Sequence, residues 1–173
     1  MNILDIAENS VRAGSSNIEI TLAQDTAQNS QTLVIKDDGK GMDAEMVQSV
    51  TDPFCTTRTT RKVGLGLPFL KMAAELTGGT LQIESAPGVG TTVTASFVLN
   101  HIDLAPLGNM GSTIATLVQC NPQLNFMYTF AKNNSRFVFD TREVRQILGD
   151  IPLSAPSVAI FIRDYITEQT EAV

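Results

Sequence analysis

Asp37-Asp38-Gly39-Lys40-Gly41-Met42 directly follows the apolar run Leu33-Val34-Ile35. The apolar run predicts a strand, and the stretch after it places a carboxylate at the strand end, with glycines two and four residues later. Such a stretch permits a tight turn whose backbone approaches a flat ligand closely, so it can hold a purine. Because acidic, glycine-rich turns also occur in ordinary loops, the interpretation depends on the other motifs of the chain.

A polar stripe lies on the helix that precedes this turn. Apolar residues at helical spacing predict a helix over residues 2–13, and Gly14 is placed to end it. Asp5, Asn9 and Arg12 recur at i, i+4 and i+7, so one face carries a carboxylate, an amide and a guanidinium. Two interpretations are open: a functional face, or polar side chains that are only solvated.

Three further motifs follow the turn. They are Asp52-Pro53-Phe54, Gly64-Leu65-Gly66-Leu67 and Gly88-Val89-Gly90-Thr91-Thr92. The second opens a predicted helix, and a glycine-rich helix start offers free backbone N–H groups and a positive dipole end to phosphate oxygens. The third joins strands predicted over residues 80–85 and 91–99.

The helix, the acidic turn and these motifs, in this order, resemble the GHKL superfamily of gyrase, heat-shock chaperone, histidine kinase and MutL ATPases. The resemblance covers residues 1–100, which we expect to form an ATP-binding domain. It implies the Bergerat fold, an α+β two-layer α/β sandwich in which helices cover a mixed sheet. A strand predicted over residues 17–22 and a helix over residues 43–50, capped by Asp43, complete this expectation.

The resemblance also implies roles for single residues. Asp37 would accept a hydrogen bond from the adenine amino group, and Asn9 would complete the shell of a Mg²⁺ ion that bridges the phosphates. A carboxylate at this position favours adenine over guanine, whose carbonyl would face it with a second acceptor. Thr91 would bond a water held by Asp37. The residues expected at ATP are Asn9, Arg12, Ala13, Asp37, Gly39, Gly41, Met42, Phe54, Arg58, Lys62, Gly64, Leu65, Gly66, Leu67 and Thr91, with Asn9 as the metal ligand.

The polar, threonine-rich segment 51–63 resembles the ATP lid of the superfamily. Its Phe54 resembles the aromatic residue of the histidine-kinase lid, and its cations include Arg58 and Lys62. Mg-ATP keeps a net negative charge, so these cations could order around it and release after hydrolysis. A surface loop with solvated charges is the alternative.

Asp5 is the candidate catalytic base. Four residues before the metal-binding Asn, gyrase and MutL proteins carry a Glu that activates water, whereas histidine kinases commonly carry Asn. Asp5 has the chemistry of a base but is one methylene shorter than Glu, so we expect slow hydrolysis.

Charge and composition exclude several classes of partner. With a net charge of −6 and a pI near 4.7, the chain lacks the basic surface typical of nucleic-acid binding and has no basic amphipathic stretch for a membrane. Cys55 and Cys120 are far apart and show no metal-binding spacing. With no signal peptide and no apolar run of spanning length, we expect a soluble, cytoplasmic protein.

Residues 101–173 fall outside the resemblance and predict a small α+β region of unknown function. A helix is predicted over residues 112–118, and two strands around the turn at 132–135 would place five aromatic side chains on one face. Asp140 and Glu143 form a capping box for the next helix, and Pro156 suits the first turn of the last one. The region is either a second domain or an extension of the same sandwich, and we expect it to pack against residues 1–100.

Three functions fit the sequence. The first is a signalling phosphotransferase that uses Mg-ATP to phosphorylate a separate partner protein; the second is a slow ATPase switch that regulates a partner or a homodimer; the third is a nucleotide sensor. Residues 80–97 resemble histidine kinases, whereas residues 9–14 resemble MutL. The lone His101 precedes a Pro-Leu pair as in a kinase phosphoacceptor box, but Ile102 replaces the usual acidic residue and Pro106 argues against a long helix, which favours a structural histidine.

Overall fold

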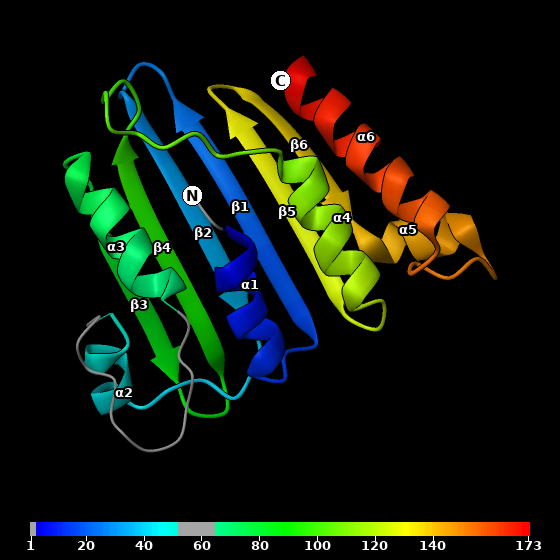
Figure 1. Cartoon of the computed structure of the whole chain (residues 1–173), viewed down its shortest axis with the longest axis horizontal. Helices are drawn as coiled ribbons and strands as arrows, with labels where there is room; N and C mark the ends of the chain where they lie inside the picture. Colours follow the sequence, from blue (N-terminus) through cyan, green and yellow to red (C-terminus); the bar gives the residue numbers. More distant parts are fainter. Residues whose placement is uncertain (1–2, 52–64) are drawn as a thin grey trace.

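The computed structural model describes residues 3–51 and 65–173. Figure 1 shows the helices and strands of this part of the chain. In chain order they are α1 (Ile3–Arg12), β1 (Asn17–Asp25), β2 (Ser30–Asp37), α2 (Ala44–Ser49), α3 (Gly66–Leu76), β3 (Leu81–Ala86), β4 (Gly90–Val98), α4 (Met110–Cys120), β5 (Asn125–Lys132), β6 (Ser135–Asp140), α5 (Thr141–Leu148) and α6 (Pro156–Ala172).

The strands of the described residues form one six-stranded mixed sheet in the order β3-β4-β2-β1-β5-β6. Strands β1 and β5 are parallel, and all other neighbours are antiparallel. Helices α1, α3 and α4 lie over one face of this sheet (Figure 1). The predicted α+β sandwich with a mixed sheet is therefore confirmed.

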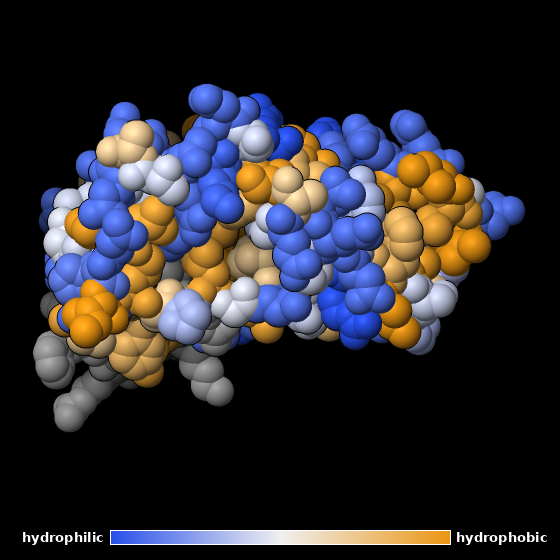
Figure 2. Space-filling view, turned by 90° about the horizontal axis from the view of Figure 1, so that it is seen from above, coloured by the Kyte–Doolittle hydropathy of each residue, from blue (hydrophilic) through white to orange (hydrophobic). Residues whose placement is uncertain are grey.

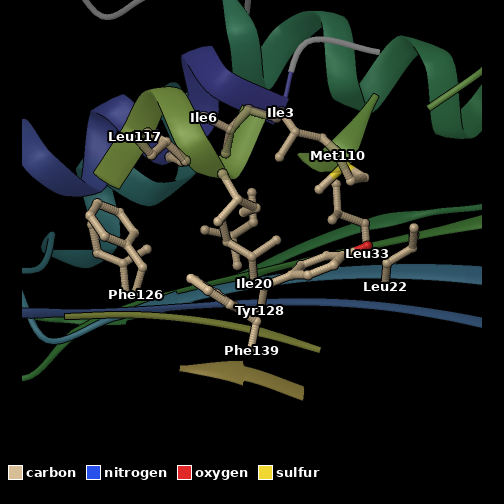
Figure 3. Packing of buried hydrophobic residues seen from close by; sticks show 14 of the residues in the cluster. Ile3, Ile6, Ile20, Leu22, Leu33, Met110, Leu117, Phe126, Tyr128 and Phe139 are labelled. Carbon is tan, nitrogen blue, oxygen red and sulfur yellow. The ribbon is translucent and has the colours of Figure 1, made fainter. Parts of the chain in front are cut away.

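The hydrophobic core lies between this face of the sheet and the helices (Figure 3). The strands alternate buried and partly exposed residues, so one face of each strand points to the helices. Ile3 and Ile6 of α1 pack on this face, and both are almost fully buried. Burial also raises the pKa of Tyr128 to about 12, so its phenol is neutral in the core at neutral pH.

Residues 101–173 extend the same sandwich. The hairpin of β5 and β6 adds to the sheet through β1, with Ile18 opposite Phe126 and Ile20 opposite Tyr128. All five aromatic side chains of the hairpin are buried, as the alternation predicts; they are Phe126, Tyr128, Phe130, Phe137 and Phe139. Helix α4 packs against α6, which lies beside it in Figure 1.

The helix starts follow the predicted capping residues, with one difference. Asp43 caps α2 by accepting from the Met46 N–H at 2.8 Å, and Pro156 begins α6. Asp140 caps α5 through the Arg142 N–H at 2.8 Å, one residue earlier than the predicted capping box requires. The same carboxylate also pairs with the Arg142 guanidinium at 2.7 Å, which favours this position.

The surface carries apolar side chains at the end of the molecule that holds α5 and α6 (Figure 2). Ile147, Ile151, Ile160 and Phe161 are each more than half exposed there. None of the helices in residues 3–51 and 65–173 combines the length and apolar character that crossing a bilayer requires.

Candidate functional site

A cavity of about 250 Å³ lies beside the turn that follows β2. Its wall comes from α1, the turn itself, α2, the start of α3 and β4. Eight of the residues predicted at ATP line it: Asn9, Arg12, Ala13, Asp37, Gly41, Met42, Leu67 and Thr91. The cavity therefore brings together residues that are up to 87 positions apart in the sequence, since its lining runs from Ile6 to Val93.

Asp37 is the buried carboxylate of this cavity, with 8% of its surface exposed. The Ser10 hydroxyl donates to one carboxylate oxygen at 2.6 Å, and the Gly39 N–H donates to the other at 2.9 Å. Each ionised oxygen can accept more than one hydrogen bond. The carboxylate is thus fixed in orientation and keeps acceptor capacity for a ligand amine.

The turn after Asp37 is packed so closely that side chains are excluded. Gly41 has a φ of +67°, and a Cβ there would collide with the Ala86 carbonyl oxygen. At Gly39, a Cβ would lie 2.8 Å from the Ser15 hydroxyl oxygen and 2.9 Å from the Ala13 Cβ. Gly39 therefore serves the site through its N–H and its close packing, and it does not line the cavity.

A hydroxyl cluster connects the turn to β3 and β4. The Ser85 hydroxyl accepts from the Met42 N–H at 2.8 Å and lies 2.9 Å from the Thr91 hydroxyl. Thr91 is also the Cα partner of Asp37 across β2 and β4. This pairing places Thr91 beside the C-terminal end of β2, next to the position where the resemblance implies a bound water.

Asn9 presents an unused amide to the cavity. Its Nδ2 is buried and has no hydrogen-bond partner among the described residues, which is costly unless a ligand supplies one. Arg12 forms an ion pair with Glu8 at 3.0 Å, with 59% of its side chain exposed. The unpaired Nδ2 is a donor and suits an acceptor such as a phosphate oxygen, while the amide oxygen is of the type that a hard cation takes, so the magnesium role of Asn9 stays a prediction.

Asp5 lies on the same side of α1 as Asn9, about one helical turn before it. It is exposed and is not part of the cavity wall. It lies next to the start of α3, because a Cβ built on Gly66 would be 3.4 Å from the Asp5 Cβ. Leu65 caps α3 without a side-chain bond and is 52% exposed.

Several lining residues were missed by the sequence reasoning. The cavity face of α1 is formed by Ile6, Asn9, Ser10 and Ala13, at i, i+3, i+4 and i+7, together with Arg12. The signal for Ser10 was a small polar residue on the apolar stripe of the helix. The other missed lining residues are Lys40, Met46, Val50 and Val93. The predicted Phe54, Arg58, Lys62 and Gly64 lie outside the described residues.

Asp38 forms hydrogen bonds with the start of β1 and does not line the cavity. It accepts from the Ser16 and Asn17 N–H groups at 2.7 and 2.9 Å, and from the Asn17 side-chain amide at 2.7 Å. The side-chain bond from Asn17, with the backbone bonds, holds the pKa of Asp38 below its usual range. The first acidic residue of the turn therefore faces the cavity, and the second ties β2 to the start of β1.

The comparisons with known proteins agree with this fold. Residues 2–101 match the family described as histidine kinase-, DNA gyrase B-, and HSP90-like ATPase, which is more than half of the 173 residues. The fold is that of an ATPase domain of this kind. The chain belongs to the histidine kinase-, DNA gyrase B- and HSP90-like ATPase family.

Two sensor kinases illustrate the sequence similarity. The chain is 31% identical over 93 residues to sensor histidine kinase YvrG of Bacillus subtilis, an alignment that covers 51% of this chain. It is 35% identical over 96 residues to sensor protein SrrB of Staphylococcus aureus, covering 53% of this chain. In both cases the aligned segment spans 16% of the relative's length.

A solved structure illustrates the fold similarity. The N-terminal domain of a DNA repair protein superposes with a TM-score of 0.50 over 78% of this chain and 49% of that chain. At 14% identity, the likeness concerns the fold alone.

Proposed function

We propose that the cavity binds ATP, with the adenine at Asp37. The observation that carries this proposal is the buried carboxylate whose two oxygens are held by Ser10 and Gly39. Held in this way, it would accept from the exocyclic amine of adenine, whereas a guanine carbonyl would meet it acceptor to acceptor. Membership of an ATPase family supports the same ligand.

The proposal is tested by a thermal shift of the whole chain with ATP, ADP and GTP, with and without Mg²⁺. A ligand that binds only the folded state raises the melting temperature by mass action. We expect ATP and ADP to raise it and GTP to leave it unchanged. An equal shift with all three nucleotides, or no shift with any, would contradict the assignment.

We also propose that Asn9 binds a Mg²⁺ ion together with the nucleotide phosphates. When bound, such an ion would neutralise phosphate charge. Within the part of the chain that the structure describes, no group of three or more His, Cys, Asp or Glu side chains is arranged to hold a metal. Such an ion would be held mainly by the phosphates and by water, with Asn9 as the amide ligand from the protein.

Asn9→Ala should weaken ATP binding about tenfold in the presence of Mg²⁺, because the ion loses its protein ligand. In EDTA, the two proteins should bind ATP with similar affinity. Isothermal titration calorimetry with and without Mg²⁺ measures both values. Asn134→Ala, in the exposed turn between β5 and β6, is the control; an equal loss in EDTA would argue against a metal role for Asn9.

We propose that the chain acts as a signalling phosphotransferase that passes the γ-phosphoryl group to a separate protein. The similarity to two sensor kinases supports this class of activity. His101 follows β4 outside any helix, and its Nδ1 accepts the Asp103 N–H at 3.1 Å, which supports an acceptor on another protein. Exposed apolar residues on α3 and just before it, Leu65, Phe69, Met72 and Leu76, offer such a protein a contact surface.

The phosphotransfer is tested by incubating the chain with γ-labelled ATP and its co-purifying proteins. Label on a second protein supports the proposal, and acid and alkali stability identifies the labelled residue type. If the sample binds ATP but neither this chain nor a co-purifying protein is labelled, the phosphotransferase is contradicted, and an ATPase switch or a nucleotide sensor is the remaining function.

A slow ATPase is the second candidate, because Asp5 lies beside Gly66 at the N-terminus of α3, where phosphates would bind. If Asp5 activates the water, Asp5→Asn should lower ATP turnover roughly 100-fold and leave ATP affinity unchanged. A phosphate-release assay measures turnover. Glu8→Gln, on the same helix, should retain it; retained turnover in Asp5→Asn would exclude this base.

A further inference from the structure

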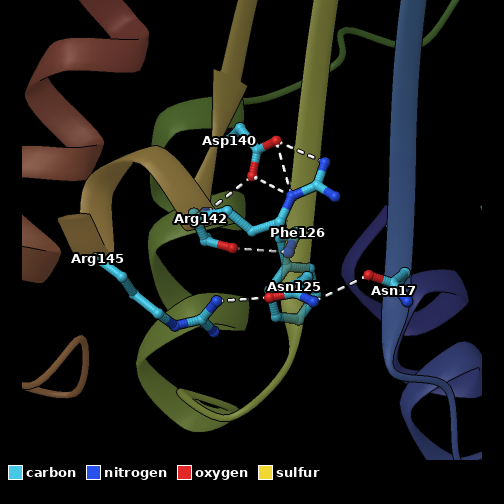
Figure 4. A network of polar contacts seen from close by, with 7 residues as sticks. Asn17, Asn125, Phe126, Asp140, Arg142 and Arg145 are labelled. Carbon is cyan, nitrogen blue, oxygen red and sulfur yellow. Dashed lines mark hydrogen bonds and ion pairs between the residues drawn. The ribbon is translucent and has the colours of Figure 1, made fainter.

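A chain of side-chain hydrogen bonds begins on α5 (Figure 4). The Arg145 guanidinium donates to the Asn125 side-chain oxygen at 2.5 Å and to the Pro122 carbonyl at 2.9 Å, and it also contacts the Leu124 carbonyl. Arg145 is partly buried. It thus fixes the loop before β5 and the first residue of that strand.

The series of hydrogen bonds continues across the parallel pair of β5 and β1. The Asn125 side-chain amide donates to the Asn17 side-chain oxygen at 2.9 Å, as Figure 4 shows. The two residues are direct partners in the sheet, and each begins its strand. The contact therefore lies at the end of the sheet where β2 delivers its acidic turn.

The series of hydrogen bonds ends at the turn of the candidate site. The Asn17 amide donates to Asp38, which shares a peptide bond with Asp37. The Asp38 carboxylate also accepts the Ser16 and Asn17 N–H groups. Holding Asp38 at three points fixes the backbone between Asp37 and the Gly39 N–H that orients the Asp37 carboxylate.

The direction of these bonds is set by the two ends. A guanidinium can only donate and a carboxylate can only accept, so both amides between them have one orientation. Each amide accepts a hydrogen bond on the side of the cation and donates one on the side of the anion. Hydrogen bonds linked in this way polarise and strengthen one another. Without the guanidinium, the Asn125 side-chain oxygen loses this donor, and only Asp38 still sets the orientation of the two amides.

We propose that Arg145 is a positioning residue for adenine recognition and acts through Asn125, Asn17 and Asp38 on the turn that carries Asp37. This inference rests on the proposed binding of ATP at Asp37. Arg145 and Asn125 lie outside residues 2–101, the part that matches the family. The C-terminal hairpin and α5 thereby set the affinity of the site for the amino group of the base.

The test uses the whole chain and two nucleotides, ATP and purine riboside triphosphate, which lacks the amino group. Arg145→Ala and Asn125→Ala should each weaken ATP binding roughly threefold to tenfold. Binding of purine riboside triphosphate, which makes no bond to Asp37, should stay within about twofold. Asn125→Ala keeps the bonds of Arg145 to the Pro122 and Leu124 carbonyls, so it tests the series of hydrogen bonds even if Arg145→Ala does not fold.

Arg142→Ala is the matched control, because Arg142 lies on the same helix and pairs with Asp140. It should leave both nucleotide affinities unchanged. An ATP affinity in Arg145→Ala and Asn125→Ala equal to that of the control would overturn the inference. An equal loss for both nucleotides would also overturn it, because that result indicates a general loss of structure.

Hydrogen exchange without nucleotide separates this inference from the proposed function. The Ser16, Asn17 and Gly39 amides donate to the two acidic side chains. They should exchange roughly threefold faster in Arg145→Ala and Asn125→Ala, and at the wild-type rate in Arg142→Ala. If the wild type binds no nucleotide, the proposed function fails. If the exchange rates of these amides in Arg145→Ala and Asn125→Ala equal those of the wild type, the positioning role of Arg145 is overturned, whatever the nucleotide result.

Discussion

Replacement of Asp37 by Asn is expected to weaken ATP binding about 100-fold, because hydrogen bonds to a charged acceptor are among the strongest in a site. The carboxylate accepts from Ser10 and Gly39 and would accept a third bond from the adenine amine. An amide has one acceptor atom in place of two. Its NH₂ group would therefore face one of these three donors.

Asp43→Asn is the matched control for this substitution. It removes the same charge six residues away, at the N-cap of α2, where Asn caps as well as Asp. Calorimetry with ATP gives both affinities, and circular dichroism verifies that each variant is folded. An ATP affinity of the Asp37→Asn protein equal to that of the control would remove Asp37 from the binding site.

The acidic turn could be predicted from the sequence because its chemistry is local. A carboxylate at a strand end and a glycine four residues later can be recognised from a few neighbouring residues, whereas the close approach of Gly41 to the Ala86 carbonyl cannot. The turn accordingly lies where it was expected, directly after β2. The N-cap Asp43 of α2 and the first helical residue Pro156 of α6 were predictable for the same reason.

The position of the cavity along α1 could not be predicted in the same way. Spacing alone placed Asp5, Asn9 and Arg12 on one polar stripe, and these residues do share a side of the helix. The stretch of the helix that the cavity reaches decides which turns of that side line it, and this stretch begins at Ile6. Asn9 and Arg12 therefore line the cavity, whereas Asp5, about one turn before Asn9, does not.

The position of the C-terminal hairpin was also beyond local patterns. Alternating aromatic residues predicted two strands with one buried face, but they gave no information about which sheet edge the hairpin joins. Pairing of β5 with β1 connects residues 108 positions apart, such as Asn17 and Asn125. The bond chain from Arg145 to Asp38 exists only because of this pairing.

Gly41→Ala is expected to lower the free energy of unfolding by about 3–5 kcal/mol, through two additive causes. A left-handed φ costs an L-residue about 1–2 kcal/mol, and here the new Cβ would also collide with the Ala86 carbonyl oxygen, so the backbone must move.

Gly88→Ala isolates the first cause. Gly88 has a similar φ of +74°, and a Cβ there would meet no atom within 4 Å. It should cost about 1 kcal/mol, or roughly 3 °C of melting temperature, whereas Gly41→Ala should cost roughly 10 °C. Thermal and urea unfolding without nucleotide measure both values. Equal losses at the two glycines would mean that backbone conformation alone, and not the close approach of the turn to β3, selects glycine at position 41.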